Sequence, residues 1–454
     1  MKAMNELKKN MAIEGEVTGL THEGQGVVKV DGYPLFVDNA LPGERVEVRI
    51  TKLGKHFGFG RNLRIIESSD DRETGLNIDY LRTGIADLGH LKYPAQLTFK
   101  RLQVSENLRK VAGKANFPVM KTLGADEPLH YRNKASVPVR RVGGLLETGF
   151  FRKHSHQLVP IEDFYIQEPR IDELIAYVRD AMRDFGLSAF DEESRRGLVR
   201  NLVVRRGHYS GELMLIIVDM NDKLPEAMIE QIKTAFPDLE SIYLNINKST
   251  GNAILSQDFK LLAGKKTITD SMLDKSFEIG PASFYQVNTA QAEKLYQTAY
   301  DFAELKESDT IIDAYSGIGT VGLAIADRVK AVYGMEVVED AVFNAKNNAK
   351  LNNIENAHYE LGKAEEVMPK WLEAGIKPDV IFVDPPRKGL DESFIEASSQ
   401  TQARNIVYIS CNPSTFARDV KRFEERGYEL EKLRPVDLFP QTHHVECVGL
   451  LRKK

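Results

Sequence analysis

Cys411 is the side chain in this sequence best suited to act as a nucleophile. It is one of only two cysteines in 454 residues and stands in the sequence Ser-Cys-Asn-Pro at 410–413, directly after an apolar segment. A thiol at the amino end of a helix ionises more readily than a free thiol, whose pKa is about 8.5. Ser414 or Thr415 is expected to cap such a helix. The alternative for a cysteine is burial as a small apolar side chain, which we expect for Cys447 in the apolar segment near the C-terminus.

Two carboxylates stand where they could work with this thiol. Asp384 opens the sequence Asp-Pro-Pro-Arg at 384–387, and Glu446 begins the last apolar segment. Glu446 is a candidate general base, whereas Asp384 could contact a cofactor or a nucleobase, or simply end a strand. Enzymes that methylate exocyclic amines carry an aromatic residue after the two prolines, and Arg387 in that place argues against such chemistry. The adjacent histidines at 443 and 444 diverge, so we expect no metal site there.

A glycine-rich loop is the candidate cofactor site. Residues 313–322 read Asp-Ala-Tyr-Ser-Gly-Ile-Gly-Thr-Val-Gly, and Glu336 follows Gly317 by 19 residues. Glycine lets the backbone approach a ligand, and a carboxylate at the position of Glu336 can accept hydrogen bonds from both hydroxyls of a ribose. The spacing also matches the fingerprint of NAD-binding proteins, although one such match is weak, and a purely structural turn is a third possibility. The acidic Asp313 favours the cationic sulfonium of S-adenosylmethionine over a pyrophosphate, which prefers bare amides.

The expected strands place these residues at one edge of a sheet. Apolar strands alternate with amphipathic helices after residue 285, with strands predicted at 310–314, 331–335, 380–383 and 405–410 and helices at 319–328, 338–352 and 413–427. This alternation predicts a doubly wound, mostly parallel Rossmann-like α/β sheet. Ligands bind such sheets beyond the carboxyl ends of the strands, which is where the three irregular sequences lie.

The remainder of the chain predicts two further domains. Five short strands separated by turns fill the first 66 residues and predict a small closed barrel; such barrels often bind oligonucleotides, although a fold alone does not give a function. Residues 67–92 are expected to be irregular, 97–111 to form a helix, and about 125–283 to form a mixed α+β domain. We therefore expect domains at 1–67, 68–283 and 284–454, with the helix near 95–115 able to pack on the last one.

Composition excludes several classes of protein. The hydrophobic fraction of 42% and the charged fraction of 28% are ordinary for a globular protein. No apolar run approaches the ~18 residues of a membrane span, and the N-terminus lacks the apolar core of a secretory signal. Two cysteines exclude a disulfide scaffold and an all-cysteine metal or iron–sulfur site. A cytoplasmic protein is expected.

Positive charge is segregated along the chain although the net charge is −5. Residues 100–157 hold 12 Lys and Arg against 4 Asp and Glu, a net of +8, and residues 195–211 hold five Arg and no acid. Segregation of this kind is typical of a surface that follows phosphates, while ordinary solvated surface charge is the alternative. On charge alone, RNA or DNA binding and a plain surface are about equally supported.

Taken together, these sequences resemble the S-adenosylmethionine-dependent RNA uracil-5-methyltransferases. The resemblance covers nearly the whole chain, and the matching motifs occur in the order of that family. Residues 26–50 look like a TRAM domain, and Ser-Phe-Tyr-Gln-Val-Asn at 283–288 is similar to the family's Ser-Phe-Phe-Gln-x-Asn. The other matches are Tyr-Arg-Asn-Lys at 131–134, the loop 313–319 with Glu336, Asp-Pro-Pro-Arg at 384–387, Ser-Cys-Asn-Pro at 410–413, and the segment 439–446.

The resemblance implies a role for each site residue. Cys411 would add to C6 of uracil, Glu446 would remove the C5 proton, and Asp384 would contact uracil or the cofactor. A uracil within a stem is out of reach, so the target would be looped out or flipped. The implied S-adenosylmethionine contacts are Gln286, Tyr315, Gly317, Glu336 and Asp384, and the first candidates for RNA contact are Arg132 and Lys134; core packing is the alternative for Tyr315.

One departure from the family pattern concerns iron and sulfur. Many rRNA-modifying members carry four cysteines for an iron–sulfur cluster, three of them just before a Gln-His-Leu-x-Tyr sequence. Here the sequence before Gly-His-Leu-Lys-Tyr at 89–93 contains none, so we expect no cluster and no metal. The TRAM-like region favours 23S rRNA over tRNA as the substrate, and no obligate protein partner is evident. Alternatives are a tRNA uracil-5-methyltransferase, an RNA-binding or chaperone protein with a vestigial site, and, remotely, an NAD-dependent oxidoreductase.

Overall fold

The N-terminal part of the chain closes into a five-stranded barrel, as predicted. The computed structural model describes residues 7–249 and 251–454, so residues 1–6 of the predicted first domain lie outside the described residues. The strands follow one another around the barrel in the order β1-β2-β3-β5-β4, and Val28, Leu35 and Val48 are among the apolar side chains that fill it. The strand bounds are β1 (Ala12–Leu20), β2 (Gly26–Val30), β3 (Tyr33–Asp38), β4 (Arg45–Leu53) and β5 (Gly58–Glu67).

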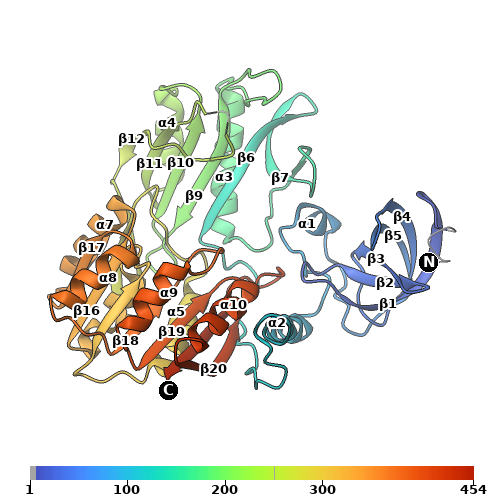
Figure 1. Cartoon of the computed structure of the whole chain (residues 1–454). Helices are drawn as coiled ribbons and strands as arrows, with labels where there is room; N and C mark the ends of the chain where they lie inside the picture. The colour runs from blue at the N-terminus through green and yellow to red at the C-terminus, as the bar shows by residue number, and fades with distance from the viewer. Residues whose placement is uncertain (1–6, 250) are drawn as a thin grey trace.

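Two helices connect the barrel to the rest of the molecule (Figure 1). The expectation of an irregular segment at 67–92 was wrong in part, because α1 (Ile78–Thr83) forms there with the side chain of Asn77 accepting a hydrogen bond from the backbone N–H of Asp79. The longer α2 (Tyr93–Asn107) continues into a π-helical turn, Leu108–Ala112, which ends at Gly113 with a positive φ. Both α2 and this turn pack against the C-terminal domain, where Val104 and Leu108 join its core.

A seven-stranded sheet with helices on one face forms the central domain, which confirms the α+β prediction. Its strand order is β12-β11-β10-β9-β6-β7-β8. Alternate residues of a strand point to opposite faces, so Leu213, Leu215 and Ile217 pack on the helix side while Met214 and its alternating partners join the core shared with the C-terminal domain. The bounds are β6 (Lys134–Val142), β7 (Leu145–Phe151), β8 (Leu158–Pro160), α3 (Pro169–Asp184), β9 (Val199–Arg206), β10 (Leu213–Asp219), α4 (Glu226–Ala235), β11 (Leu239–Ile246) and β12 (Phe259–Gly264).

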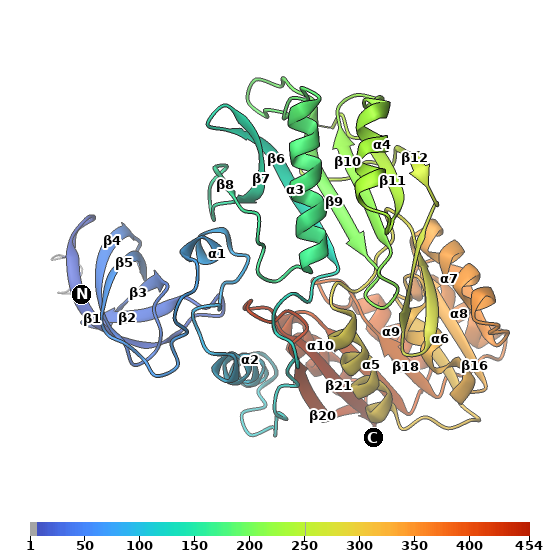
Figure 2. The same ribbon diagram turned by 180° about the vertical axis from the view of Figure 1, so that it is seen from behind.

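The C-terminal domain is the doubly wound sheet that the sequence predicts (Figure 2). Its order is β17-β16-β15-β18-β19-β21-β20, and β21 runs antiparallel to both of its neighbours. The bounds are α5 (Thr289–Ala303), β15 (Thr310–Ala314), α6 (Thr320–Ile325), β16 (Ala331–Glu336), α7 (Glu339–Leu351), β17 (Ala357–Leu361), α8 (Ala364–Glu373), β18 (Val380–Val383), α9 (Glu392–Gln400), β19 (Asn405–Ser410), α10 (Pro413–Glu424), β20 (Tyr428–Val436) and β21 (Glu446–Lys453).

A hairpin crosses between the two large domains. It consists of β13 (Ile268–Met272) and β14 (Lys275–Ile279), which lie within the range predicted for the central domain, yet it packs on α7. The backbone N–H of Ser276 donates to Asn352 Oδ1 at 2.8 Å, and that of Glu278 donates to Asn348 Oδ1 at 3.0 Å. The domain division at residue 283 therefore stays a prediction.

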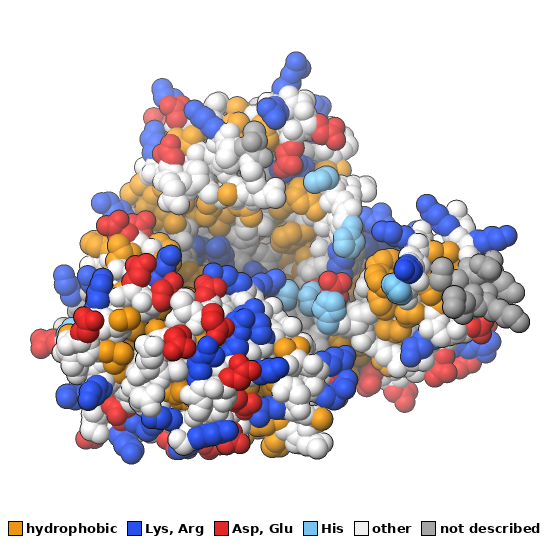
Figure 3. Space-filling model, viewed as in Figure 1, with side chains coloured by type: hydrophobic (Ala, Val, Ile, Leu, Met, Phe, Trp, Pro, Cys, Tyr) orange, Lys and Arg blue, Asp and Glu red, His pale blue; other side chains and the backbone are white. Residues whose placement is uncertain are grey.

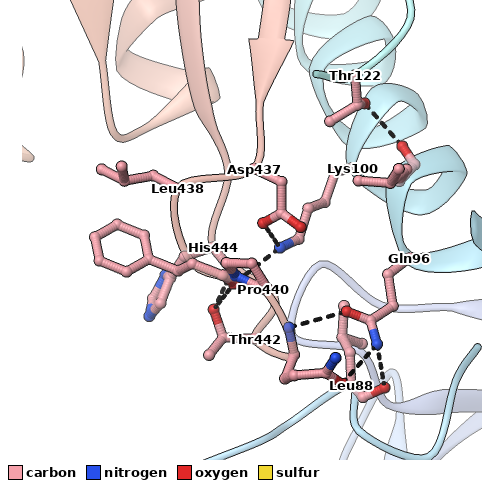
Figure 4. A network of polar contacts seen from close by, with 12 residues as sticks. Leu88, Gln96, Lys100, Thr122, Asp437, Leu438, Pro440, Thr442 and His444 are labelled. Atoms are coloured by element: carbon pink, nitrogen blue, oxygen red, sulfur yellow. Dashed lines mark hydrogen bonds and ion pairs between the residues drawn. The ribbon is translucent and has the colours of Figure 1, made fainter. Parts of the chain in front are cut away.

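A buried clasp joins α2 to the loop between β20 and β21 (Figure 4). Lys100 and Asp437 form an ion pair in which both side chains are fully buried, and Lys100 Nζ also donates to the carbonyl of Phe439 at 3.0 Å. One turn earlier, Gln96 Nε2 donates to Gln441 Oε1 at 2.9 Å and Gln96 Oε1 accepts from the backbone N–H of Gln441 at 3.0 Å. The helix thus fixes the loop that leads into Glu446.

We predict that Lys100→Met destabilises the protein strongly, because Asp437 stays buried without its cation. Breaking a buried pair by removing one partner typically costs about 3–5 kcal/mol of the free energy of unfolding. Urea unfolding followed by tryptophan fluorescence measures the change, since Trp371 lies in the adjoining core. The double variant Lys100→Met/Asp437→Leu should recover much of the loss. Lys110→Met, at an exposed ion pair with Glu106, is the matched control and should leave the unfolding curve unchanged.

Candidate active site

Cys411 and Glu446 lie side by side because of the register between two strands. Ser410, the last residue of β19, pairs with Cys447 in the antiparallel strand β21. The residue after Ser410 therefore stands opposite the residue before Cys447. Asp384 follows β18, the parallel neighbour of β19, so the predicted nucleophile and both predicted carboxylates meet at one edge of the sheet.

The thiol of Cys411 is harder to ionise than a free thiol. Burial, followed by the neighbouring carboxyls of Glu446 and Asp384, raises its pKa to about 12, and Arg387 only partly opposes them. The expectation that the helix terminus eases ionisation was therefore wrong, because desolvation and negative neighbours outweigh the helix. The expected caps were also wrong: Asn412 caps α10, and its Oδ1 accepts from the backbone N–H of Ser414 at 3.0 Å.

The two carboxyls are themselves weak acids in this site. Burial and the charge of Asp384 raise the pKa of Glu446 to about 8, and burial raises the pKa of Asp384 to about 7. A carboxyl whose pKa lies near the working pH can both take up and release a proton, which suits a general base. Cys447 is fully buried beside them, as expected, and burial raises the pKa of its thiol as well.

Hydrogen bonds tie the loops that carry Cys411 and Asp384 to one another. Asn412 Nδ2 donates to the carbonyl of Arg387 at 3.1 Å, which links the Ser-Cys-Asn-Pro and Asp-Pro-Pro-Arg loops. Arg387 Nη2 lies 3.5 Å from His444 Nε2, and burial lowers the pKa of His444 to about 4, so this ring is neutral and can accept. The neighbouring His443 Nδ1 lies 2.9 Å from Asp87 Oδ2. His443 and His444 therefore connect the loop that carries Arg387 to the segment before α2.

Backbone amides order the glycine-rich loop around Glu336. The backbone N–H of Gly317 donates to Glu336 Oε2 at 3.1 Å, so the carboxylate closes the loop from the neighbouring strand. Asp313 Oδ2 accepts from the backbone N–H of Gly322 at 2.9 Å. Tyr315 and Gly317 both have a positive φ, 63° and 54°, and a Cβ built on Gly317 would meet nothing within 4 Å. The loop thus leaves room for a ligand over Gly317, between the ends of β15 and β16.

Gln286 lies between this loop and the central domain. Its side chain is buried, with Nε2 donating to the hydroxyl of Tyr296 at 3.2 Å, and its carbonyl accepts from Asn133 Nδ2 at 3.0 Å. Asn288 caps α5 and donates through Nδ2 to the carbonyl of Leu438 at 3.0 Å. Tyr296 was not singled out in the sequence, and Asn133 was noted only as part of the Tyr-Arg-Asn-Lys motif, because no spacing rule reveals their contacts with Gln286.

The basic stretches are less available than their charge suggests. Lys100 is buried with Asp437, and Lys153 pairs with Asp87 at 2.5 Å, so neither is free for phosphate. Arg132 and Lys134 differ: within the described part of the chain, neither has an acidic partner within ion-pair distance. Among the described residues, no group of three or more His, Cys, Asp or Glu is arranged to hold a metal ion. No helix in the part of the chain covered by the structure is long and apolar enough to cross a membrane.

Comparison with known protein families identifies the chain. A family model described as "tRNA (Uracil-5-)-methyltransferase" matches residues 92–454, and a TRAM domain model matches residues 13–63. The chain belongs to the tRNA (uracil-5-)-methyltransferase family. The family assignment, the TRAM barrel and the methyltransferase fold predicted from the sequence are thereby confirmed.

Several relatives and one solved structure agree with this assignment. An uncharacterized RNA methyltransferase of Lactococcus lactis, YljE, is 59% identical and covers 99% of both chains, and one of Streptococcus mutans is 58% identical and covers 98% of this chain and all of its own. The tRNA (uracil-54, C5)-methyltransferase of Pyrococcus abyssi, solved with S-adenosyl-L-homocysteine, is 29% identical with a TM-score of 0.78. It covers 97% of this chain and 100% of its own.

The protein is an S-adenosylmethionine-dependent RNA methyltransferase, and its residues fit that cofactor. The open space over Gly317 and the carboxylate of Glu336 suit a nucleoside, and the acidic groups Asp313 and Asp384 suit a cation. The predicted S-adenosylmethionine is confirmed as the methyl donor, and the NAD alternative is set aside.

The raised thiol pKa predicts a distinctive alkylation profile. We expect the rate at which iodoacetamide modifies Cys411, followed by mass spectrometry, to rise with pH beyond pH 9 without a plateau. Above pH 8 Glu446 is charged and repels the thiolate, so Glu446→Gln should speed the reaction there by about tenfold for each unit by which the pKa falls. Below pH 7 Glu446 is mostly protonated, and the variant should react like the wild type.

Exposed Glu355, which lies far from the thiol in sequence, supplies the control. Glu355→Gln should leave the whole alkylation profile unchanged, and buried Cys447 should stay unmodified in every sample. A plateau below pH 8.5 in the wild-type profile would contradict the raised pKa.

Proposed function

We propose that this enzyme methylates C5 of a uridine in 23S rRNA through a covalent bond between Cys411 and C6 of the base. The observation that carries this proposal is the strand register that brings the thiol of Cys411 beside Glu446 in a desolvated site. Uracil C5 is a weak nucleophile, and addition of a thiolate at C6 activates it. The complete set of Cys411, Glu446 and Asp384 argues against a vestigial site in a chaperone.

The proposed reaction consists of addition at C6, methyl transfer to C5 and elimination. Cys411 loses its thiol proton to solvent, the resulting thiolate bonds to C6, and the electron pair of the C5–C6 double bond moves toward C5 and the O4 enolate. C5 takes the methyl group, which S-adenosylmethionine supplies when bound. Glu446 accepts the C5 proton, the double bond reforms, and the C6–S bond breaks to release the thiolate. Asp384 would hydrogen-bond the uracil edge once it is protonated, which its raised pKa permits near neutral pH.

The cofactor contacts are proposed for the residues that the sequence singled out. Glu336 would accept from the ribose hydroxyls, and Gly317 would let the backbone approach the ligand. Gln286, whose Nε2 donates to the hydroxyl of Tyr296, would contact the cofactor from the segment before α5. Tyr315 packs its ring 5.5 Å from Phe394, so its contact would come from the exposed part of the ring. The full proposed set is Gln286, Tyr315, Gly317, Glu336 and Asp384.

The choice of 23S rRNA rests on the TRAM barrel, because the tRNA-modifying members that this chain resembles generally lack one. The second candidate is tRNA, and a specific observation favours it. The Pyrococcus enzyme, named for tRNA uracil-54, covers 97% of this chain, which leaves too few residues for the barrel to lie outside the match. Both RNAs therefore enter the test below, and a cytoplasmic location follows for either.

An outward face of the barrel supports single-stranded RNA as the partner. Phe36 and Phe59 are cross-strand neighbours on β3 and β5, and Phe57 stacks on Phe36 with ring centroids 5.1 Å apart. Phe57 is 43% exposed, and residues 49–64 hold five Lys and Arg and no acid. Figure 3 shows hydrophobic side chains on the barrel bordered by Lys, Arg and His. Aromatic platforms flanked by cations bind unpaired bases.

We predict that RNA containing 5-fluorouridine traps the enzyme. Fluorine at C5 cannot leave as a proton, so the complex should stall after methyl transfer. Total rRNA and total tRNA from a strain that lacks the gene are incubated separately with S-adenosylmethionine, and a denaturing gel detects the covalent band. Cys411→Ala should abolish the band and Cys447→Ala should keep it. Sequencing the trapped RNA names the uridine, and a band with tRNA alone would replace 23S rRNA as the substrate.

Loss of the base should trap the enzyme on ordinary RNA. In Glu446→Gln the C5 proton cannot be removed, so a band should form without fluorine, and turnover should fall by about 10²–10⁴-fold. Incorporation of tritiated methyl groups measures turnover. Full turnover in this variant would remove Glu446 from the proposed role.

The aromatic face of the barrel should contribute to affinity. Phe57→Ala removes one stacking surface, worth about 1–3 kcal/mol per base or about 5- to 150-fold in Kd, which filter binding of the trapped RNA sequence measures. Phe343→Ala, at an exposed phenylalanine of α7, is the control and should not change Kd. Equal affinities for both variants would exclude the face from RNA binding.

A further inference from the structure

A separate cavity lies beside the catalytic loop. Its volume is about 340 Å³, and its walls come from the segment after α1, from β6 and β7, and from the loop between β20 and β21. Cys411, Glu446, Asp384 and Gln286 do not line it. The lining residues that matter below are Arg132, Lys134, Ser136, Phe150, Gln167 and His444. Figure 3 shows the surface hollowed between the three domains, with Lys, Arg and His side chains around the hollow.

Two buried polar groups in this cavity have no partner. Gln167 is 2% exposed, and within the described residues its Nε2 meets no acceptor. Ser136 Oγ is likewise buried and unpaired among the residues that the structure describes. A buried donor without a partner is destabilising, and a ligand in this cavity would supply the missing hydrogen bonds.

The cations in the cavity also lack a counterpart. Lys134 pairs across the strands with Arg205 and stands near Arg132, and in the described chain no carboxylate lies within ion-pair distance of Lys134 or Arg132. Burial and these two guanidinium groups lower the pKa of Lys134 to about 7. An acceptor from outside would offset both the desolvation and the repulsion. Asp87 also lines the cavity, but its carboxylate is already engaged by Lys153 and His443. The missing ligand therefore offers acceptors and no positive charge.

The shape and the aromatic wall indicate a nucleobase. Small-molecule sites occupy roughly 300–1,000 Å³, so this cavity holds one nucleotide and not several. Phe150 supplies an apolar surface, while Gln167, Lys134 and Arg132 supply donors. Guanine presents O6 and N7 as two adjacent acceptors, which lysine and arginine commonly bind.

The cavity adjoins the proposed binding site of the target uridine. His444 lines the cavity and also contacts Arg387 of the Asp-Pro-Pro-Arg loop. The motif Tyr-Arg-Asn-Lys contributes to both the cofactor side and the cavity. Asn133 donates to the carbonyl of Gln286, whereas Arg132 and Lys134 line the cavity. A nucleotide next in the chain to the flipped uridine would reach this place without leaving the strand.

We propose that this cavity binds the base of a nucleotide immediately adjacent to the target uridine and selects guanine through the donors of Gln167, Lys134 and Arg132. This inference rests on the proposed function, since it requires an RNA whose uridine enters the site of Cys411. The cavity would then be a specificity pocket that helps to hold the flanking strand out of its helix.

An abasic scan of the substrate tests the proposal. The probe is a synthetic oligoribonucleotide with the sequence recovered from the fluorouridine adduct, made with an abasic residue at each position within two nucleotides of the uridine. We expect one immediate neighbour to be sensitive, with kcat/KM of the wild-type enzyme falling at least tenfold. Guanine at that position should exceed adenine by about tenfold. No sensitive neighbour, or a preference for another base, would overturn the proposal.

Combining variants of the cavity with removal of the base tests whether the sensitive base binds in this cavity. Gln167→Leu/Lys134→Met should lose at least tenfold on the intact RNA and lose nothing further when the sensitive base is removed. Ser136→Ala, a milder change in case the double variant folds poorly, should show the same pattern on a smaller scale. Lys330→Met, at an exposed lysine just before β16 on the opposite edge of the sheet, should behave as the wild type. Fully additive losses would place the base elsewhere.

The same assay separates this inference from the proposed function. If the intact oligoribonucleotide is methylated but no neighbouring base matters, the cavity proposal fails and the uridine methylation stands. If no RNA is methylated or trapped by Cys411, the proposed function itself fails. Retention of S-adenosylmethionine binding by each variant, measured by calorimetry, shows that the variants are folded.

Discussion

The buried ion pair between Lys100 and Asp437 is the interaction on which the arrangement of the active site depends. Two charges without solvent exposure are tolerated only when they satisfy each other, so α2 and the loop before β21 must stay together. That loop leads directly into Glu446, and its residue Gln441 is also held by Gln96 and by the N–H of Leu88, which donates to the carbonyl of Gln441 at 2.8 Å.

Desolvation is the main physical cause of the raised pKa values in the site. Cys411, Asp384, Glu446 and Asp313 are all weaker acids than in water, and burial is the largest contribution to the raised pKa of each. Four acidic groups in a small dry volume cannot all ionise, because each new charge raises the cost of the next. A cationic sulfonium beside them would favour their ionised forms. The site without its cofactor therefore disfavours the thiolate of Cys411, and binding of the cofactor would favour it.

The sequence predicted local order well and long-range contacts poorly. The bounds of β15, β18 and β19 and the register-defining position of Glu446 follow from apolar runs and turn residues, which act within a few positions. The clasp of Lys100 with Asp437 joins residues 337 positions apart, and no spacing rule indicates it. The prediction that Cys411 ionises easily was wrong for a related reason. The helix terminus can be recognised in the sequence, whereas burial of the thiol and its proximity to Glu446 arise only on folding. Likewise, the charge count at 100–157 included cations that the fold places in ion pairs.

The central sheet determines how RNA recognition and methyl transfer are connected. Because β10 is buried on both faces, one set of its residues packs on α3 and α4 and the other packs on the cofactor domain. Sliding one domain over the other would expose the second set to water, so burial of these side chains opposes such a movement. Asn133 donates a hydrogen bond across this interface to the backbone carbonyl of Gln286. In the sequence Asn133 lies between Arg132 and Lys134, the two cations of the neighbouring cavity. A displacement of the strand that carries Arg132 and Lys134 would therefore move Gln286 as well, and an RNA that seats correctly against the central domain would also set the position of the cofactor relative to Cys411.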